Sequence, residues 1–404
     1  MRNYLKDAQG KRIFDLAIDR DYPNRVISYP TFGELSEILA KDFDLIESSM
    51  QYGMPTFVVR WPGYEIPSIE HQCEVFDKLE QQADRYRLWP VVRWKDEESG
   101  EYFIRFAPQQ EEEKGDMRIN YALFVATLAT ISLAGFLQAT SPVFLTLFYP
   151  NGWNIWDLVF VTGTFLLALM GIVFTHEMGH YLTAKRRGID SSAPYFIPGL
   201  PQIGGTFGAF IQQKSPPQNR RDLFDLGIAG PLAGFAVTLV VLVAGFLMSV
   251  PVTAEQLEAI DAAFPNMTGS LPVPYLFVIL EMIFSGFIPP GGTIYLHPIA
   301  FASWVGCLVT ALNLFPAGQL DGGHALRAIV GPKKHKYIGY AAIAVMFLMG
   351  IYLMAILVLF MSRGEHPGPL NDTVPISKTR VALFVFAIIV VALSIPPLWQ
   401  TFTF

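Results

Sequence analysis

The hydrophobic positions of the chain gather after residue 118, where they form long uninterrupted stretches. One stretch, residues 158–175, reads LVFVTGTFLLALMGIVFT and holds no charged residue. A helix needs about 20 apolar residues to cross a bilayer, and six segments approach that length. The predicted spans lie near residues 119–138, 158–184, 224–249, 297–314, 337–361 and 381–400. The pattern therefore predicts a polytopic α-helical membrane protein with about six transmembrane helices.

Charged positions are concentrated before the first of these spans. Of the 64 Asp, Glu, Lys and Arg side chains, 39 lie in residues 1–118 and 25 in the remaining 286 residues. Soluble proteins carry charge on about a quarter of their residues, so the first part resembles an ordinary soluble domain. We expect two domains, a soluble one at residues 1–118 and a membrane domain at residues 119–404.

The soluble part shows the periodicity of a small α+β fold. Alternating residues predict strands, and apolar residues at helical spacing predict one helix, for which Ser68 is a candidate N-cap. The predicted strands are residues 56–61, 88–94 and 101–108, and the predicted helix is residues 68–87. The sequence QQEEEKGD (109–116) follows as a charged connector to the membrane domain.

Lysine and arginine are unevenly distributed among the loops. Loops 139–157 and 250–296 contain neither residue, whereas the loops on the other side of the predicted spans carry clusters. Cytoplasmic loops are enriched in Lys and Arg, so six spans place the N-terminal domain and the C-terminus in the cytoplasm. Arg363, Lys378 and Arg380 conflict with this arrangement, because the last predicted hairpin puts them on the outer face.

Residues 273–290 form a further apolar segment. Glu281 interrupts it and prolines bound it. Counting it as a span would reverse the side of the positive loop that follows. We therefore expect a helix that lies on the outer interface or dips into it.

Composition narrows the range of partners and redox chemistry. The net charge of −6 lies mostly in the polar part and gives no indication of nucleic-acid binding. The two cysteines, Cys73 and Cys307, fall in regions of different character, so we expect neither a disulfide framework nor a cysteine metal cluster. The N-terminal 20 residues lack the apolar core of a signal peptide.

The candidate chemistry begins at the end of the second predicted span, in the sequence HEMGH. His176 and His180 are four residues apart, so on a helix they share one face and can hold one metal ion. Glu177 adjoins the first ligand and can act as general base on a metal-bound water. Two histidines hydrogen-bonded in a helical core are the alternative, but three ionisable groups in a membrane span are costly and normally functional.

A catalytic zinc ion takes three protein ligands and leaves one position open for water. Asp321, in the sequence QLDGG, is the best candidate for the third ligand because ionisable residues are few in the apolar part. Pro316 removes a helical hydrogen bond, so we expect the chain between Asn313 and Asp321 to be unwound and to line a cavity. Alternatively, Asp321 caps a helix that starts at Gly322 or Gly323, or it both caps that helix and binds the metal.

Taken together, the two motifs resemble the signature of the site-2 protease family of intramembrane metalloproteases. HExxH stands at residues 176–180 and NxxPxxxLDGG at residues 313–323. The resemblance covers roughly residues 119–400 and is greatest to the branch of plastid EGY-type proteases and their bacterial and archaeal relatives. The soluble N-terminal domain and the sequences GGTFGAFIQQKS (204–215) and AGPLAG (229–234) are shared with that branch.

The resemblance implies a zinc metalloendopeptidase that cuts transmembrane segments of other proteins in regulated intramembrane proteolysis. It assigns one zinc ion to His176, His180 and Asp321 and the role of catalytic base to Glu177. The implied partners are transmembrane protein substrates, the lipid bilayer and a membrane regulatory partner, with no nucleic acid. We expect a multi-pass protein of a prokaryotic cell membrane, with the N-terminal domain and the active site toward the cytoplasm.

Substrate-binding residues are also implied by the resemblance. Asn313 matches an Asn that holds the substrate or stabilises the oxyanion, and Gly205 and Phe207 match an element of a membrane-associated β-hairpin. The residues themselves agree with a hairpin, because segment 193–213 is apolar but too rich in Gly and Pro for a spanning helix. An unpaired strand edge there could bind an extended chain. A re-entrant loop that plugs the site is the alternative.

The other histidines of the apolar part carry weaker expectations. His324 follows the LDGG turn and is either a partner of a metal ligand or a capping and packing residue. His297 opens a predicted span on the outer face, where an interfacial role is favoured. His335 and His366 fall in predicted loops.

Two other classes of function compete with the protease. A membrane scaffold or chaperone would bind spans without cutting them, and a structural zinc in it would need a fourth protein ligand, for which the apolar part offers no clear candidate. A metal-ion transporter would need polar residues along both halves of a pathway, whereas here they gather near one face.

Overall fold

The computed structural model describes residues 4–6, 12–15, 30–51, 53–64, 66–109, 116–265, 270–362, 366–396 and 401–403. Most of the predicted charged connector and Arg363 lie outside these residues. The chain divides into two compact units. Unit 1 combines residues 1–113 with two short later segments, residues 216–222 and 368–375, and unit 2 contains the rest.

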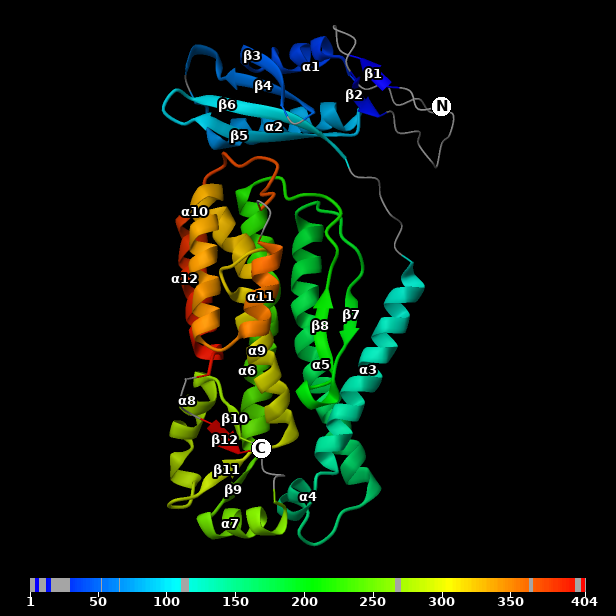
Figure 1. Ribbon diagram of the computed structural model, residues 1–404, viewed down its shortest axis with the longest axis vertical. Helices are drawn as coiled ribbons and strands as arrows, with labels where there is room; N and C mark the ends of the chain where they lie inside the picture. Colours follow the sequence, from blue (N-terminus) through cyan, green and yellow to red (C-terminus); the bar gives the residue numbers. More distant parts are fainter. Residues whose placement is uncertain are drawn as a thin grey trace. The chain divides into compact units, whose positions relative to one another are not determined.

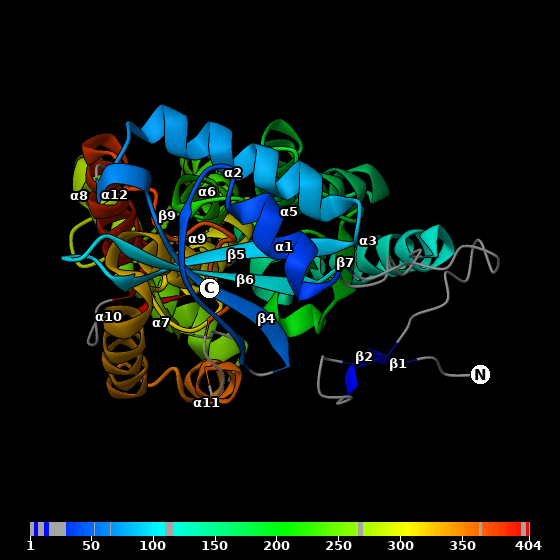
Figure 2. The same ribbon diagram turned by 90° about the horizontal axis from the view of Figure 1, so that it is seen from above.

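Unit 1 is built on a four-stranded antiparallel sheet with the strand order β3-β4-β6-β5, against which two helices pack (Figure 2). Phe57 and Ile104 of the sheet are fully buried beside Leu79 of the second helix. The predicted strands and helix are confirmed, and Ser68 caps the helix by accepting from the His71 amide. The elements are β1 (Tyr4–Lys6), β2 (Arg12–Asp15), α1 (Phe32–Leu39), β3 (Asp44–Gln51), β4 (Met54–Arg60), η1 (Pro62–Tyr64), α2 (Ile69–Asp84), β5 (Leu88–Asp96) and β6 (Glu101–Pro108).

The two later segments of unit 1 complete the edge of this sheet beyond β5. The Val92 amide donates to the Leu370 carbonyl at 2.8 Å, and the Asp372 amide donates to the Val92 carbonyl at 3.1 Å. Leu370 in turn donates its amide to the Pro217 carbonyl, and its side chain is buried in the core of the unit. The sequence did not indicate that this small domain includes residues 216–222 and 368–375, which lie in loops between predicted spans.

Unit 2 is mainly helical, and its long helices run alongside one another (Figure 1). Its first part contains α3 (Met117–Ala139), α4 (Pro142–Phe148), α5 (Ile155–Arg186), β7 (Tyr195–Pro198), η2 (Pro201–Ile203), β8 (Thr206–Phe210) and α6 (Arg220–Leu247). Its second part contains β9 (Val250–Val252), α7 (Ala254–Ala263), β10 (Ser270–Pro272), α8 (Tyr275–Ile283), η3 (Ser285–Phe287), β11 (Thr293–Tyr295), α9 (Pro298–Leu314), α10 (Asp321–Leu348), α11 (Tyr352–Met361), α12 (Lys378–Ser394) and β12 (Thr401–Thr403).

Among the described residues, three helices are long and apolar enough to cross a membrane: α3, α5 and α6. The apolar helix α9 is shorter, with 17 residues. The three long apolar helices support a helical membrane protein, but the predicted number of six transmembrane helices is not confirmed.

The predicted span at residues 337–361 is wrong, because the chain reverses within it. α10 ends at Leu348, Gly350 adopts a left-handed φ of 79°, and α11 begins two residues later. α11 then returns toward the start of α10, where a Cβ on Gly318 would lie 2.7 Å from the Ser362 hydroxyl. A hydropathy window reads the apolar composition of both arms but cannot detect the turn that glycine permits between them.

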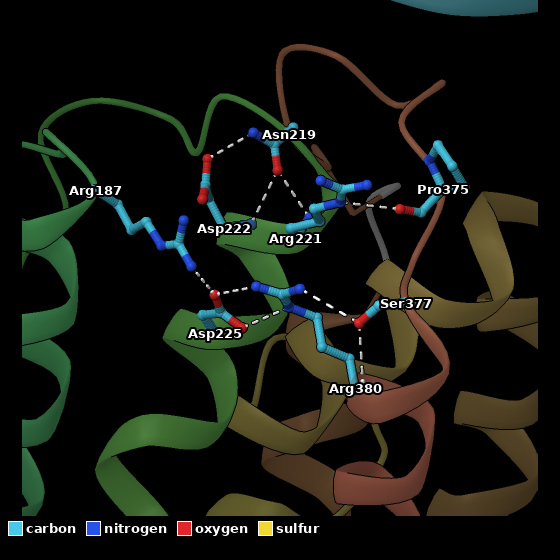
Figure 3. A network of polar contacts seen from close by, with 8 residues as sticks. All are labelled: Arg187, Asn219, Arg221, Asp222, Asp225, Pro375, Ser377 and Arg380. Atoms are coloured by element: carbon cyan, nitrogen blue, oxygen red, sulfur yellow. Dashed lines mark hydrogen bonds and ion pairs between the residues drawn. The ribbon is translucent and has the colours of Figure 1, made fainter. Parts of the chain in front are cut away.

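This reversal also removes the charge conflict in the last predicted hairpin. Six spans would separate Arg380 from Arg187 by the whole thickness of the bilayer. In the structure both guanidinium groups bind the carboxylate of Asp225, so they lie at the same level of unit 2 (Figure 3). The final helix, α12, ends at Ser394, so the predicted span at residues 381–400 is also shorter than expected.

The predicted β-hairpin is present, and the segment after α7 is helical as expected. β7 and β8 pair antiparallel, with Tyr195 opposite Phe210 and Pro198 opposite Thr206. Residues 273–290 contain α8, whose nine residues are too few to cross a bilayer.

Candidate metal centre

The last turns of α5 carry His176, Glu177 and His180. Asn154 caps the start of this 32-residue helix with a capping box. The last turn of the helix carries Lys185 and Arg186, whose positive charges interact favourably with the negative end of the helix dipole. The four-residue spacing puts both imidazoles on one face, with their Nε2 atoms 3.2 Å apart. His176 and Glu177 are each 4% exposed.

Asp321 reaches the same point from the first turn of α10. Its Oδ2 lies 3.5 Å from Nε2 of His176 and 3.2 Å from Nε2 of His180. The preceding loop packs so closely on this helix that a Cβ on Gly323 would lie 2.6 Å from the Ala317 carbonyl. The N-cap position belongs to Leu320. Asp321 therefore does not cap a helix that starts after it, contrary to the alternative considered from the sequence.

The spacing of these three ligand atoms fits one zinc ion. Two ligand atoms on a tetrahedral zinc, each at about 2.0–2.1 Å from the ion, stand about 3.3 Å apart. The three observed separations are 3.2, 3.2 and 3.5 Å. Two imidazole nitrogens and one carboxylate oxygen form a donor set that zinc accepts, and three protein ligands leave one position for water. Oε1 of Glu177 lies 4.0 Å from Nε2 of His176, beside these three ligand atoms.

Three glycines of α6 allow this helix to pass directly against the ligands. A Cβ on Gly227 would lie 2.5 Å from the Asp321 carbonyl oxygen, and one on Gly234 would lie 3.0 Å from Cβ of His176. A Cβ on Gly230 would collide with the imidazole of His180. In the sequence, AGPLAG (229–234) was notable only as a feature shared with the EGY-type branch. The spacing of three and four residues between these glycines was a signal of a helix face packed without side chains.

The carbonyl of Leu226, also on α6, orients His180. Nδ1 of His180 lies 2.9 Å from this oxygen, so Nδ1 carries the proton and Nε2 keeps its lone pair toward the ligand cluster. The adjacent Asp225 accepts from Nε and Nη2 of Arg380 at 2.8 and 2.7 Å and also binds Arg187 (Figure 3). The ion pairs thereby fix the start of α6, and with it the carbonyl that holds His180.

A cavity of about 280 Å³ opens at the cluster. Asn313, in the last turn of α9, lines this cavity together with Gln319 and His324. The hairpin contributes Phe210 and the residues on either side of it. Extended backbone therefore lies beside the candidate ligands.

The two hairpin residues named from the sequence lie elsewhere. Gly205 has a φ of 84°, and its carbonyl accepts from the Thr130 hydroxyl at 2.6 Å, which ties the hairpin to α3. Phe207 is 61% exposed and does not line the cavity. The structure thus brings Asn313 to the ligand cluster but not Gly205 or Phe207.

The remaining histidines occupy defined positions. His297 is the N-cap of α9, where its Nδ1 accepts from the Ile299 amide, as suits a residue that opens a helix. His335 lies inside α10 and is buried, not in a loop. Nε2 of His366 pairs with Nδ1 of His324 at 2.8 Å, a contact that the sequence did not indicate.

Comparison with known proteins gives one family. Residues 164–357 match the model of peptidase family M50. The chain is 32% identical over 272 residues to the probable zinc metalloprotease EGY1, chloroplastic, of Arabidopsis thaliana, which covers 65% of this chain and 46% of that protein. It is 31% identical over 238 residues to EGY2 of Oryza sativa subsp. indica, which covers 55% of this chain and 41% of that protein. No solved structure matches the chain.

The chain spans less than half the length of these two relatives. A more distant relative, the probable zinc metalloprotease EGY3 of Oryza sativa subsp. japonica, is 22% identical over 391 residues, which covers 90% of this chain and 66% of that protein. All three are chloroplast proteins of plants, which does not fit the expectation of a prokaryotic cell membrane. The matched region contains the end of α5 and the start of α10, and residues 164–357 form a domain of peptidase family M50, the site-2 protease family.

Proposed function

We propose that this chain is an intramembrane zinc metalloendopeptidase that cleaves transmembrane segments of other membrane proteins. One observation carries the proposal: the ligand atoms of His176, His180 and Asp321 are spaced for a single zinc ion, with the buried carboxylate of Glu177 beside them. Two of the three ligands stand on a helix that is long and apolar enough to cross a membrane.

The residues around the cavity have separate roles in the proposed peptide hydrolysis. A bound zinc ion would polarise the scissile carbonyl and lower the pKa of a water molecule. Glu177 takes the proton from that water and passes it to the leaving amine. Asn313, which lines the same cavity, is placed to donate a hydrogen bond to the substrate or to its developing oxyanion.

A substrate helix must unwind before its peptide bond can react, because helical carbonyls are already hydrogen-bonded. β8 belongs to a two-stranded sheet, and its last residue, Phe210, lines the cavity. An extended substrate segment can pair with such an edge. We therefore assign substrate alignment to the end of β8 near Phe210, with Asn313 in the same cavity as a second contact to the substrate.

The site lies near the end of α5, where water can reach it. His180 lies five residues before Lys185, which corresponds to about 7.5 Å along a helix. Lys185 and Arg186 end the helix and mark the interface with water. By the positive-inside rule this end faces the cytoplasm or its equivalent, so substrate arrives from the lipid and water from that face.

The proposal is tested with the Glu177→Gln variant, assayed on a reporter with a single transmembrane segment. We expect zinc content to stay near one ion per chain and cleavage to fall about 10²–10⁴-fold, the usual contribution of a general base. Glu258→Gln, at an exposed position on α7, is the matched control and should cleave normally. Cleavage by Glu177→Gln at the control rate would refute the mechanism. If zinc binds but wild-type protein leaves several such reporters intact, the scaffold interpretation replaces it.

A further inference from the structure

A second cavity, of about 370 Å³, lies between α10 and the end of α11. It is larger than the cavity at the metal centre, and the protease mechanism uses none of its charged residues. Its polar lining includes Arg327, Lys333, His335, Lys336, Ser362 and His366. We propose that this cavity binds a phosphate-bearing ligand with a hydroxyl group, of the glycerophosphate type.

The charges of the cavity select an anion. Arg327, only 1% exposed, converges on it with Lys333 and Lys336, and none of its described lining residues is acidic. Guanidinium and ammonium groups are the usual partners of phosphate oxygens, and their attraction is strengthened where water is partly excluded. The same three positive charges oppose a divalent cation. The nearby histidine pair does not offset them, because His324 and His366 already bind each other at 2.8 Å.

His335 adds a requirement for a hydroxyl group. Its side chain is buried, lines the cavity, and has no partner for Nε2 among the described residues. The backbone of Gly318 and Gly323 lies within reach of the ring, so we assign the proton to Nδ1, which can meet it, and leave Nε2 as an acceptor. A buried acceptor without a donor is costly. A ligand hydroxyl satisfies it while the phosphate group meets the cations.

The surroundings of the cavity resemble a membrane interface. Tyr337 is 75% exposed and Phe360 is 62% exposed, on the two helices that form the cavity. Aromatic side chains at such a level, next to lysines, are typical of the headgroup region, and basic pockets between helices there bind anionic lipid headgroups. The glycerophosphate group occurs both in phosphatidylglycerol and in free glycerol phosphate, and these two sources need separate measurements.

The first experiment measures lipid retention by native mass spectrometry of the full chain, released from nanodiscs of phosphatidylglycerol or of phosphatidylcholine. Retained phosphatidylglycerol, with no retained phosphatidylcholine, supports the lipid as source. Binding of glycerol 3-phosphate alone to detergent-solubilised protein, by titration calorimetry, supports the soluble source instead. If the protein retains both lipids equally, or binds none of the three probes, the proposal is overturned.

Variants then locate the ligand. The double variant Lys333→Ala, Lys336→Ala should bind at least tenfold more weakly, since each lysine contributes to phosphate attraction. The control is Lys334→Ala, an exposed lysine between them that does not line the cavity. Equal losses in the control and the double variant would show only a diffuse basic surface and overturn the proposal. All three lysines are exposed, so these variants should fold.

The role of His335 is tested by two amides of different length. In His335→Gln the side-chain amide reaches the place of Nε2, so binding should be largely kept. In His335→Asn it reaches only the place of Nδ1, so binding should fall severalfold. An Asn variant that binds as well as the Gln variant would refute the hydroxyl contact.

Discussion

Gly230→Ala tests whether the close approach of α6 sets the geometry of the candidate zinc ligands. An added Cβ would lie 2.6 Å from Cε1 of His180 and closer still to Nε2, whereas ordinary contacts begin at about 3.4 Å. The ring or α6 must therefore move by about 0.8 Å or more. Metal sites hold their ligand distances to within about 0.2 Å, so a shift of this size takes Nε2 out of reach.

We expect zinc affinity to fall at least 100-fold in Gly230→Ala, at the upper end of what is lost when only the partner of a ligand is removed. If α6 moves instead of the ring, overpacking should lower the free energy of unfolding by about 1–3 kcal/mol. Competition with a chelator of known affinity measures the first quantity, and denaturant unfolding in detergent measures the second. The cleavage assay is not needed for either.

Gly171→Ala is the matched control on α5, because a Cβ there meets nothing within 4 Å. This variant should keep zinc affinity and gain up to about 1 kcal/mol of stability, as Ala replaces Gly in a helix. If Gly230→Ala binds zinc as tightly as Gly171→Ala and unfolds no more easily, α6 does not constrain His180 and the reasoning is refuted.

Two further predictions concern charge. Asp225→Asn, which leaves Arg187 and Arg380 without their shared carboxylate, should cost about 2–3 kcal/mol of unfolding free energy by denaturant titration; an unchanged value would show that the ion pairs are screened. In unit 1, burial and the nearby Asp77 raise the pKa of Glu80. The folded state then holds this proton more tightly, so stability is full below the ordinary carboxyl pKa and falls as pH rises through the raised one. Glu80→Gln should flatten this fall, measured by hydrogen exchange in α2 between about pH 4 and pH 8.

Local patterns explain which features were predictable. A four-residue spacing puts His176 and His180 on one helix face whatever the tertiary structure, and the scarcity of ionisable residues singled out Asp321. The first inference used only the spacing of neighbouring residues and the second used the composition of the apolar part, and the structure places the three side chains together. Strands β5 and β6 followed from alternation around a turn in the same way.

Features that depend on distant contacts were missed. The hydropathy of residues 337–361 is the same for one long helix as for two short ones, and only Gly350 carries the difference. β3 shows no alternation because most of its side chains are exposed, and α1 is only eight residues long, although Thr31 and Glu34 form a capping box at its start. The need for glycine in α6 can be recognised only from the close packing of α5 and α10 against it.

The edge of β5 has a consequence for the order in which this protein is made. Arg93 and the carbonyl of Leu370 to which it donates are 277 residues apart. At about 5–20 residues per second, the ribosome needs on the order of 15–55 s to synthesise that interval. During this time the apolar helices emerge while the sheet has an open edge, a known route to aggregation. Unit 1 therefore finishes folding after the helices from α3 to α11 have been synthesised, although most of its residues leave the ribosome before those helices do.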